Sequence, residues 1–138
     1  MDRVEGYIIR PNLQEQDSPG EEVIRNVSDS LVSTLVELHN VDINEANLNN
    51  LGKIDGYVKR QVEGWIKRYN HSKTDIIANM DFVAKWLNDN QPLEVEGSIV
   101  HNDFKYDNLV LDKNNHSKIT AVLDWEMATL GDPFMDLG

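Results

Sequence analysis

The stretch His101-Asn102-Asp103-Phe104-Lys105-Tyr106-Asp107-Asn108 lies between two short apolar segments, Ser98–Val100 and Leu109–Leu111. The apolar segments have the composition of β-strands, so the polar stretch between them is predicted to be a loop held by strands. Catalytic groups are often placed on such loops, because the strands fix both ends. A further acid, Asp124, follows the apolar run 119–123. The sequence therefore predicts a site built from one loop and one strand end.

These residue types suit phosphoryl transfer, which needs an oriented hydroxyl and metal ions held by oxygen ligands. Asp103 can orient a hydroxyl and take its proton. Asn108, five residues later, and Asp124 can each offer an oxygen to a metal ion. The spacing H-x-D-x-x-x-x-N matches the catalytic loop of protein kinases, which carry a downstream Asp-Phe-Gly where this chain has Asp124-Trp125-Glu126.

Three segments together, 101–108, 122–126 and 131–137, resemble the aminoglycoside phosphotransferase family, which is choline kinase-like. The family often shows H-G-D-x-x-x-x-N, then D-W-E, then G-D-P with D-L. Residues 61–65, Gln-Val-Glu-Gly-Trp, resemble the branch of the family that is fused to acyl-CoA dehydrogenases in some animals. Residues 1–6 are similar to the hinge between the two lobes of the family. The resemblance thus covers nearly the whole chain.

The resemblance implies a role for each matching residue. Asp103 would be the catalytic base or the residue that orients the acceptor hydroxyl, and Lys105 would lie near the γ-phosphate as a catalytic and nucleotide-binding residue. Asn108 and Asp124 would bind Mg²⁺ and, through it, ATP. Two further residues would support the loop: His101 would brace it, and Asp136 would accept hydrogen bonds from its backbone N–H groups.

Two features depart from the family. Asn102 occupies a position where glycine is common, although asparagine tolerates a positive φ better than most residues. The sequence also contains no Gly-rich phosphate loop and no lysine in a V-A-I-K-like strand, which kinases carry in their N-terminal lobe. We therefore expect residues 1–138 to be a partial phosphotransferase domain that begins at the interlobe hinge and is truncated at the C-terminus.

The expected fold class is α+β and mostly α, a kinase-like C-lobe whose helices precede a small β-hairpin. Apolar residues at helical spacing predict a first helix that starts with a capping box at 18–21 and ends near 39–40. A second helix is expected around 58–69. A third is expected after a cap at Ser72 or Thr74, with an inner face that includes Ile76. We expect strands at 98–100, 109–111 and 119–123, a turn at 130–133, Trp65, Tyr69 and Trp86 in or near the core, and His39 on the surface.

Composition excludes several classes of function. The formal net charge of -11 argues against a nucleic-acid groove and an anionic membrane surface, both of which require basic residues. The absence of cysteine excludes disulfides and a cysteine nucleophile. No apolar run reaches the roughly 18 residues of a membrane span, and the start lacks a signal peptide, so we expect a cytoplasmic protein.

The preferred interpretation is an ATP- and Mg²⁺-dependent phosphotransferase C-lobe that acts on a small hydroxylated molecule, with a separate N-lobe chain as a possible partner. One rival is a non-catalytic fragment that serves as a binding module or as one half of a split enzyme; the missing lobe favours it. A weaker rival is a metal-dependent hydrolase that uses His101, Asp103 and Asp124. The sequence leaves open whether the chain alone is active, which acceptor it uses and its oligomeric state.

Overall fold

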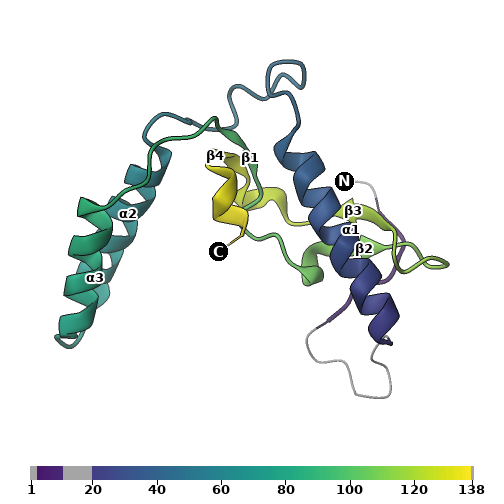
Figure 1. Cartoon of the computed structure of the whole chain (residues 1–138), viewed down its shortest axis with the longest axis horizontal. Coiled ribbons are helices and arrows are strands. Elements are labelled where there is room, and N and C mark those ends of the chain that lie inside the picture. The colour runs from purple at the N-terminus through teal and green to yellow at the C-terminus, as the bar shows by residue number, and fades with distance from the viewer. Residues whose placement is uncertain (1–2, 11–19, 138) are drawn as a thin grey trace.

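The structure is a computed structural model that describes residues 3–10 and 20–137. Three helices come first, α1 (Glu21–His39), α2 (Tyr57–Ser72) and α3 (Ala78–Asp89), and short strands follow them (Figure 1). The strands are β1 (Ser98–Val100), β2 (Leu109–Leu111), β3 (Ile119–Val122) and β4 (Thr129–Gly131). Three 3₁₀ turns lie between or after the strands, at Tyr106–Asn108, Trp125–Met127 and Pro133–Asp136. The expected α+β, mostly α class is confirmed.

Strands β2 and β3 form the expected antiparallel hairpin. Its turn is held by the Asp112 carboxylate, which accepts hydrogen bonds from the backbone N–H groups of Asn114 at 2.8 Å and Asn115 at 3.0 Å. Tyr7 extends this pairing, because its backbone N–H and C=O both bond to Leu111. Tyr7 therefore lies against the hairpin that follows the predicted catalytic loop.

A second strand pair, β1 with β4, was not predicted. The sequence suggested a turn at 130–133, but Leu130 and Gly131 belong to β4, and Pro133 opens the next 3₁₀ turn. The pattern failed because β4 has only three residues, Thr-Leu-Gly, which is too short to show alternation. The pairing matters for the site, since it fixes the start of the 101–108 loop against the segment after Asp124.

The core lies between α1 and the strands. The inner face of α1 includes Val27, which is fully buried, and Leu35, which is 5% exposed, and this helix packs on β1 and β3. Leu109 and Leu111 of β2 are each 1% exposed. The helix ends at His39 as expected and begins after Gly20, whereas Ser18 and Pro19 of the predicted capping box lie outside the described residues.

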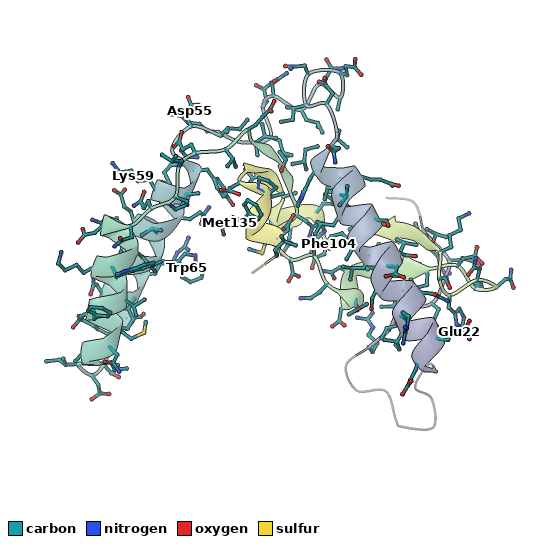
Figure 2. The ribbon with its side chains drawn as sticks, in the orientation of Figure 1. Glu22, Asp55, Lys59, Trp65, Phe104 and Met135 are labelled. Carbon is teal, nitrogen blue, oxygen red and sulfur yellow. The ribbon has the colours of Figure 1, made fainter. Side chains whose placement is uncertain are left out.

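Helices α2 and α3 pack on each other and project from the rest of the molecule (Figure 1). Trp65 of α2 is 62% exposed and Trp86 of α3 is 52% exposed, so their predicted place in the core is wrong. Figure 2 shows Trp65 on this projecting pair, away from Phe104 of the predicted loop. Helical spacing identified an apolar face correctly, but it could not show that the face meets one neighbouring helix only.

The predicted start of α3 is also wrong. Ser72 is instead the last residue of α2, its hydroxyl donates to the carbonyl of Arg68 four residues earlier, and Lys73 leaves the helix with an extended backbone. Thr74 bonds to the adjacent Asp75, and α3 begins at Ala78. Ile76 therefore precedes the helix and is 87% exposed.

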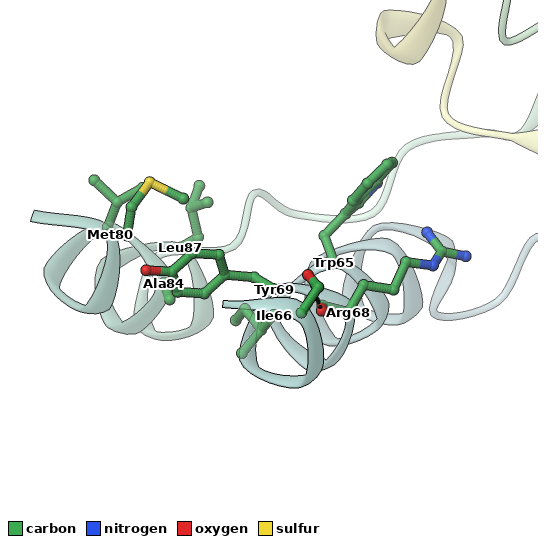
Figure 3. A pocket seen from close by; sticks show the side chains of 9 residues that line it. Trp65, Ile66, Arg68, Tyr69, Met80, Ala84 and Leu87 are labelled. Atoms are coloured by element: carbon green, nitrogen blue, oxygen red, sulfur yellow. Dashed lines mark hydrogen bonds between the residues drawn. The ribbon is translucent and has the colours of Figure 1, made fainter. Parts of the chain in front are cut away.

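An apolar groove of about 360 Å³ runs between these two helices (Figure 3). Its lining includes Tyr69, Met80, Val83 and Leu87, and Tyr69 is half-buried there. In residues 3–10 and 20–137, no helix combines the length and the apolarity that crossing a membrane requires.

Candidate active site

The backbone of the 101–108 loop is held by one buried carboxylate. Asp136 accepts the N–H of His101 at 2.9 Å and the N–H of Asn102 at 2.6 Å, and its side chain is fully buried. Asp136 ends the 3₁₀ turn that Pro133 opens, and Asp132 caps this turn by accepting the N–H of Phe134. The bonds from the loop backbone to Asp136 that the resemblance implied are confirmed.

His39, at the end of α1, is a site residue that the sequence did not reveal. Its Nε2 lies 2.9 Å from Oδ2 of Asp136, and its side chain is only 15% exposed. The expectation of a surface histidine is therefore wrong. No spacing rule could find this contact, because 97 residues separate the partners.

His101 is fully buried and braces the loop. Its Nε2 lies 2.9 Å from the carbonyl of Leu123, which can only accept, so Nε2 carries the hydrogen. Nδ1 then accepts the N–H of Asp103 at 3.3 Å. Both ring nitrogens are thus engaged, which confirms a core histidine and leaves none free to bind a metal ion as the hydrolase interpretation requires.

Asp103 and Asn108 are brought into direct contact by the loop. The Asn108 amide Nδ2 donates to the backbone oxygen of Asp103 at 2.8 Å and to its carboxylate at 2.9 Å. Asn108 is 8% exposed, and the short 3₁₀ turn Tyr106–Asn108 directs it back over the loop. Because the amide nitrogen is committed to Asp103, the amide oxygen is the atom that can face a cation.

Asp124 lies next to this pair through the backbone. The N–H of Leu123 donates to the carbonyl of Asn108 at 2.8 Å, so the residue after Leu123 emerges beside the loop. Asp124 has a left-handed backbone, with φ 68° and ψ 53°, and its side chain is exposed. Aspartate adopts this conformation more readily than most residues, and here it ends the extended run that includes β3. The Asp124 carboxylate therefore lies beyond the end of β3 and is exposed to solvent.

Lys105 supplies the positive charge of the site. Its ammonium lies 2.8 Å from the Asp103 carboxylate, with the two side chains 52% and 31% exposed. This hydrogen-bonded ion pair lowers the pKa of Asp103, and desolvation partly opposes the shift. The same pairing raises the pKa of Lys105, with smaller contributions from the charges of Asp107 and Asp124.

The donor set fits a magnesium ion better than a softer metal. An amide oxygen from Asn108 and a carboxylate from Asp124 are hard ligands of the kind that Mg²⁺ prefers with phosphate oxygens. In the described parts of the chain, no three His, Asp or Glu side chains gather around one point. Two protein ligands suit an ion that arrives with a bound polyphosphate, which completes its coordination.

The fold is that of kinase-like phosphotransferases, as comparisons with known proteins show. The phosphotransferase enzyme (APH) family matches residues 1–138. A putative aminoglycoside phosphotransferase from Ralstonia eutropha superposes on 99% of this chain with a TM-score of 0.88 and 34% identity. A macrolide 2'-phosphotransferase type I shares the fold, with a TM-score of 0.74 over 98% of this chain at 18% identity.

The chain belongs to the phosphotransferase enzyme (APH) family. Acyl-CoA dehydrogenase family member 11 of Rattus norvegicus is 41% identical over 138 residues, which are 99% of this chain. The predicted resemblance to the branch associated with acyl-CoA dehydrogenases is therefore confirmed. The chain spans 17% of that curated relative and 41% of the Ralstonia chain, while the macrolide enzyme is covered over 46% of its length.

Proposed function

We propose that this chain carries the catalytic loop and metal ligands of an ATP- and Mg²⁺-dependent phosphotransferase that phosphorylates a hydroxyl group of a small molecule. One observation carries the proposal. Asn108 bonds to Asp103 through its side chain at 2.9 Å and to the residue before Asp124 through its backbone at 2.8 Å. These two bonds support the assignment of a proton-accepting carboxylate and two hard oxygen ligands to a single site.

We assign to Asp103 the role of binding and orienting the acceptor hydroxyl group. An aspartate carboxylate is ionised at neutral pH, and the hydrogen bond from Lys105 lowers the pKa of Asp103 further. The Asp103 side chain is also partly exposed to solvent, whereas Asn108 is buried. It would hold the acceptor O–H in line with the γ-phosphorus and receive the proton as the new O–P bond forms. A carboxylate with a lowered pKa is a weak base, so orientation is the larger part of this role.

Asn108 and Asp124 are the residues that we assign to the metal ion. Bound Mg²⁺ would neutralise charge on the phosphate oxygens and offset the repulsion between ATP and an acidic site. Lys105, whose ammonium rests on Asp103, can turn toward a phosphate on its flexible stem once a substrate occupies the site. Asp103 would then lose its contact with Lys105 and gain one with the acceptor hydroxyl.

The acceptor class is suggested by the relatives. Proteins named as acyl-CoA dehydrogenase family members contain the matching segment, which favours a metabolite such as a hydroxyacyl thioester over an antibiotic. The groups that clamp the adenine and the α- and β-phosphates would come from a further lobe, in the same polypeptide or as a separate chain. We expect this chain alone to bind Mg²⁺–ATP weakly and to turn over very slowly.

The test is a phosphate-transfer assay over small alcohols and hydroxyacyl thioesters, combined with calorimetric titration of Mg²⁺–ATP. Both are run on the chain alone and with the remaining lobe added in cis or in trans. Asp103→Asn should lower kcat by about a thousandfold or more with nucleotide affinity nearly intact, since its partner is the acceptor. Asp124→Ala should weaken both metal–nucleotide binding and turnover.

Absence of transfer and of nucleotide binding in the complemented protein would overturn the proposal in favour of a non-catalytic binding module. Efficient turnover by the chain alone would contradict the two-lobe part of it. Asp112→Asn is a matched control for the loss of a carboxylate, because Asp112 lies in the hairpin turn and bonds to backbone N–H groups there. It should leave both nucleotide binding and turnover unchanged.

A further inference from the structure

The side chain of Asn102 connects three separate segments of the chain. Asn102 directly precedes Asp103, and its amide Nδ2 donates to the carbonyl of Met127 at 2.9 Å, three residues beyond Asp124. Its amide oxygen accepts a hydrogen bond from the hydroxyl of Tyr57 at 3.1 Å. Because the Met127 carbonyl can only accept, the orientation of the amide is determined, and the Tyr57 hydroxyl must be the donor to it.

Tyr57 is well placed to transmit a constraint. It is the first residue of α2, only 5% exposed, and its ring lies against Gly131 of β4. A Cβ atom at Gly131 would come within 2.6–2.8 Å of the ring, so the helix start meets β4 without a gap. Burial raises the pKa of Tyr57, which keeps the hydroxyl protonated as a donor. The first turn of α2 is thereby attached to the site.

The backbone at Asn102 explains why the side chain matters. Its φ is 62°, in the left-handed region that glycine occupies freely, and its N–H is bonded to Asp136. A glycine would satisfy the same backbone geometry. What asparagine adds is the two side-chain bonds, one to the segment after Asp124 and one to α2.

We propose that Tyr57 and Asn102 are positioning residues that hold the Asp103 segment against the segment following Asp124 and couple both to the start of α2. The proposal assigns these residues a role in the reaction proposed above and rests on it for that part. The mechanical link itself is independent of any activity. Without the link, the loop would still be anchored at Asp136, but the two halves of the site would shift relative to each other.

The first test is hydrogen exchange on the chain itself, which needs no substrate. Tyr57→Phe removes one hydroxyl and keeps the ring on Gly131, and Asn102→Gly keeps the left-handed backbone and removes both side-chain bonds. In each variant, amide exchange at 101–104 and 126–129 should rise by about three- to tenfold, the effect of losing a net hydrogen bond. Amides in the middle of α1 should stay within about twofold of the wild type.

The double variant distinguishes a link from two unrelated bonds. Since Tyr57 acts through Asn102, adding Tyr57→Phe to Asn102→Gly should produce no further increase in exchange at 101–104. Tyr69→Phe is the matched control, because the Tyr69 hydroxyl is buried in the α2–α3 pair without a hydrogen-bond partner among the described residues. It should leave exchange at 101–104 unchanged.

Kinetics of the complemented phosphotransferase give the second readout. Tyr57→Phe should lower kcat by about three- to tenfold while KM for ATP stays within about twofold, because the geometry between Asp103 and Asp124 changes but nucleotide contacts do not. Exchange that is unchanged at 101–104, or that rises equally in α1, would overturn the proposal. Altered exchange in a protein that transfers no phosphate would instead refute the proposed function and leave the link standing.

Discussion

The pKa of Asp103 is lowered mainly by one neighbouring cation. The Lys105 ammonium, 2.8 Å away, lowers the carboxyl pKa by hydrogen bonding and by its charge, assisted by the amide of Asn108. Asp103 is accessible to solvent, so the stabilisation that this shift contributes to the fold is small. It is present above the pKa of the unfolded chain and is lost as the pH falls through the lower, folded-state pKa.

We therefore predict the direction in which Lys105 moves this titration. In an NMR titration of the side-chain carboxyl carbons, Asp103 should titrate below the ordinary aspartate value of about 3.9. In Lys105→Met the midpoint should move upward toward that value, because the cation that favours the ionised form is gone. Lys105→Arg should preserve most of the shift.

Asp112 provides an internal control in the same spectra. Its pKa is lowered mainly by the backbone N–H groups of Asn114 and Asn115, which Lys105→Met does not touch. Asp112 should therefore keep its midpoint in every variant. An Asp103 midpoint that is unchanged in Lys105→Met would mean that the ion pair does not control the carboxylate.

At the residue scale, the sequence was enough to identify the candidate catalytic residues, but not the residues that hold them in place. The spacing from His101 to Asn108 carries the family pattern, so the candidate acid, amide and lysine were visible at once. His39 and Tyr57 were not, because their contacts with Asp136 and Asn102 join residues 97 and 45 positions apart. Hydrogen bonds between residues so far apart in the sequence produce no periodic pattern from which they could be predicted.

At the element scale, the packing of α2 on β4 depends on the absence of a side chain at Gly131. An added Cβ would meet the Tyr57 ring at 2.6–2.8 Å, closer than side chains approach without displacement. Gly64, in the middle of α2, has open space around its Cα, with no heavy atom within 4 Å of an added Cβ. We therefore expect alanine at these two positions to change the free energy of unfolding in opposite directions.

Gly131→Ala should destabilise the fold by about 1–3 kcal/mol, the usual cost of overpacking, because Tyr57 must move away from β4. Gly64→Ala should stabilise it by about 0.5–1 kcal/mol through helix propensity. Urea denaturation of the two variants beside the wild type measures both changes. Equal effects, or a stabilising Gly131→Ala, would show that the start of α2 is not packed on β4.

Elements with a clear hydrophobic periodicity could be predicted from the sequence, whereas elements that form only by pairing with a distant strand could not. Helix α1 has apolar residues at helical spacing, and its C-terminal end was predicted correctly. The partner of β1 could not be predicted, because Thr129–Gly131 becomes a strand only by pairing with Ser98–Val100. The apolar faces of α2 and α3 were recognised, yet α3 contains no buried residue, since periodicity reveals a face and not what covers it.

At the scale of the whole molecule, the chain has two parts with different surroundings. Helix α1, the strands and the 101–108 loop share one core, whereas α2 and α3 extend from it (Figure 1). The α2–α3 pair leaves apolar side chains exposed along its groove. The apolar groove between α2 and α3 is lined by residues other than Asp103, Asn108 and Asp124, so it is separate from the candidate site. The side chains of Asp103 and Lys105 in the candidate site are 31% and 52% exposed, so solvent reaches them in this chain.

The central claim is that Asp103, Asn108 and Asp124 form one site for a metal-bound nucleotide. It is tested most directly by adding Mn²⁺ and excess ATP to the ¹⁵N-labelled chain and recording which amide signals broaden. We predict that the signals of residues 103, 108 and 124 broaden first, that those of Lys85 and Asp89 on α3 persist, and that Asp124→Ala suppresses the broadening. Broadening that begins elsewhere, for example at Asp42 or Asp112, or that is unaffected by Asp124→Ala, would contradict the account.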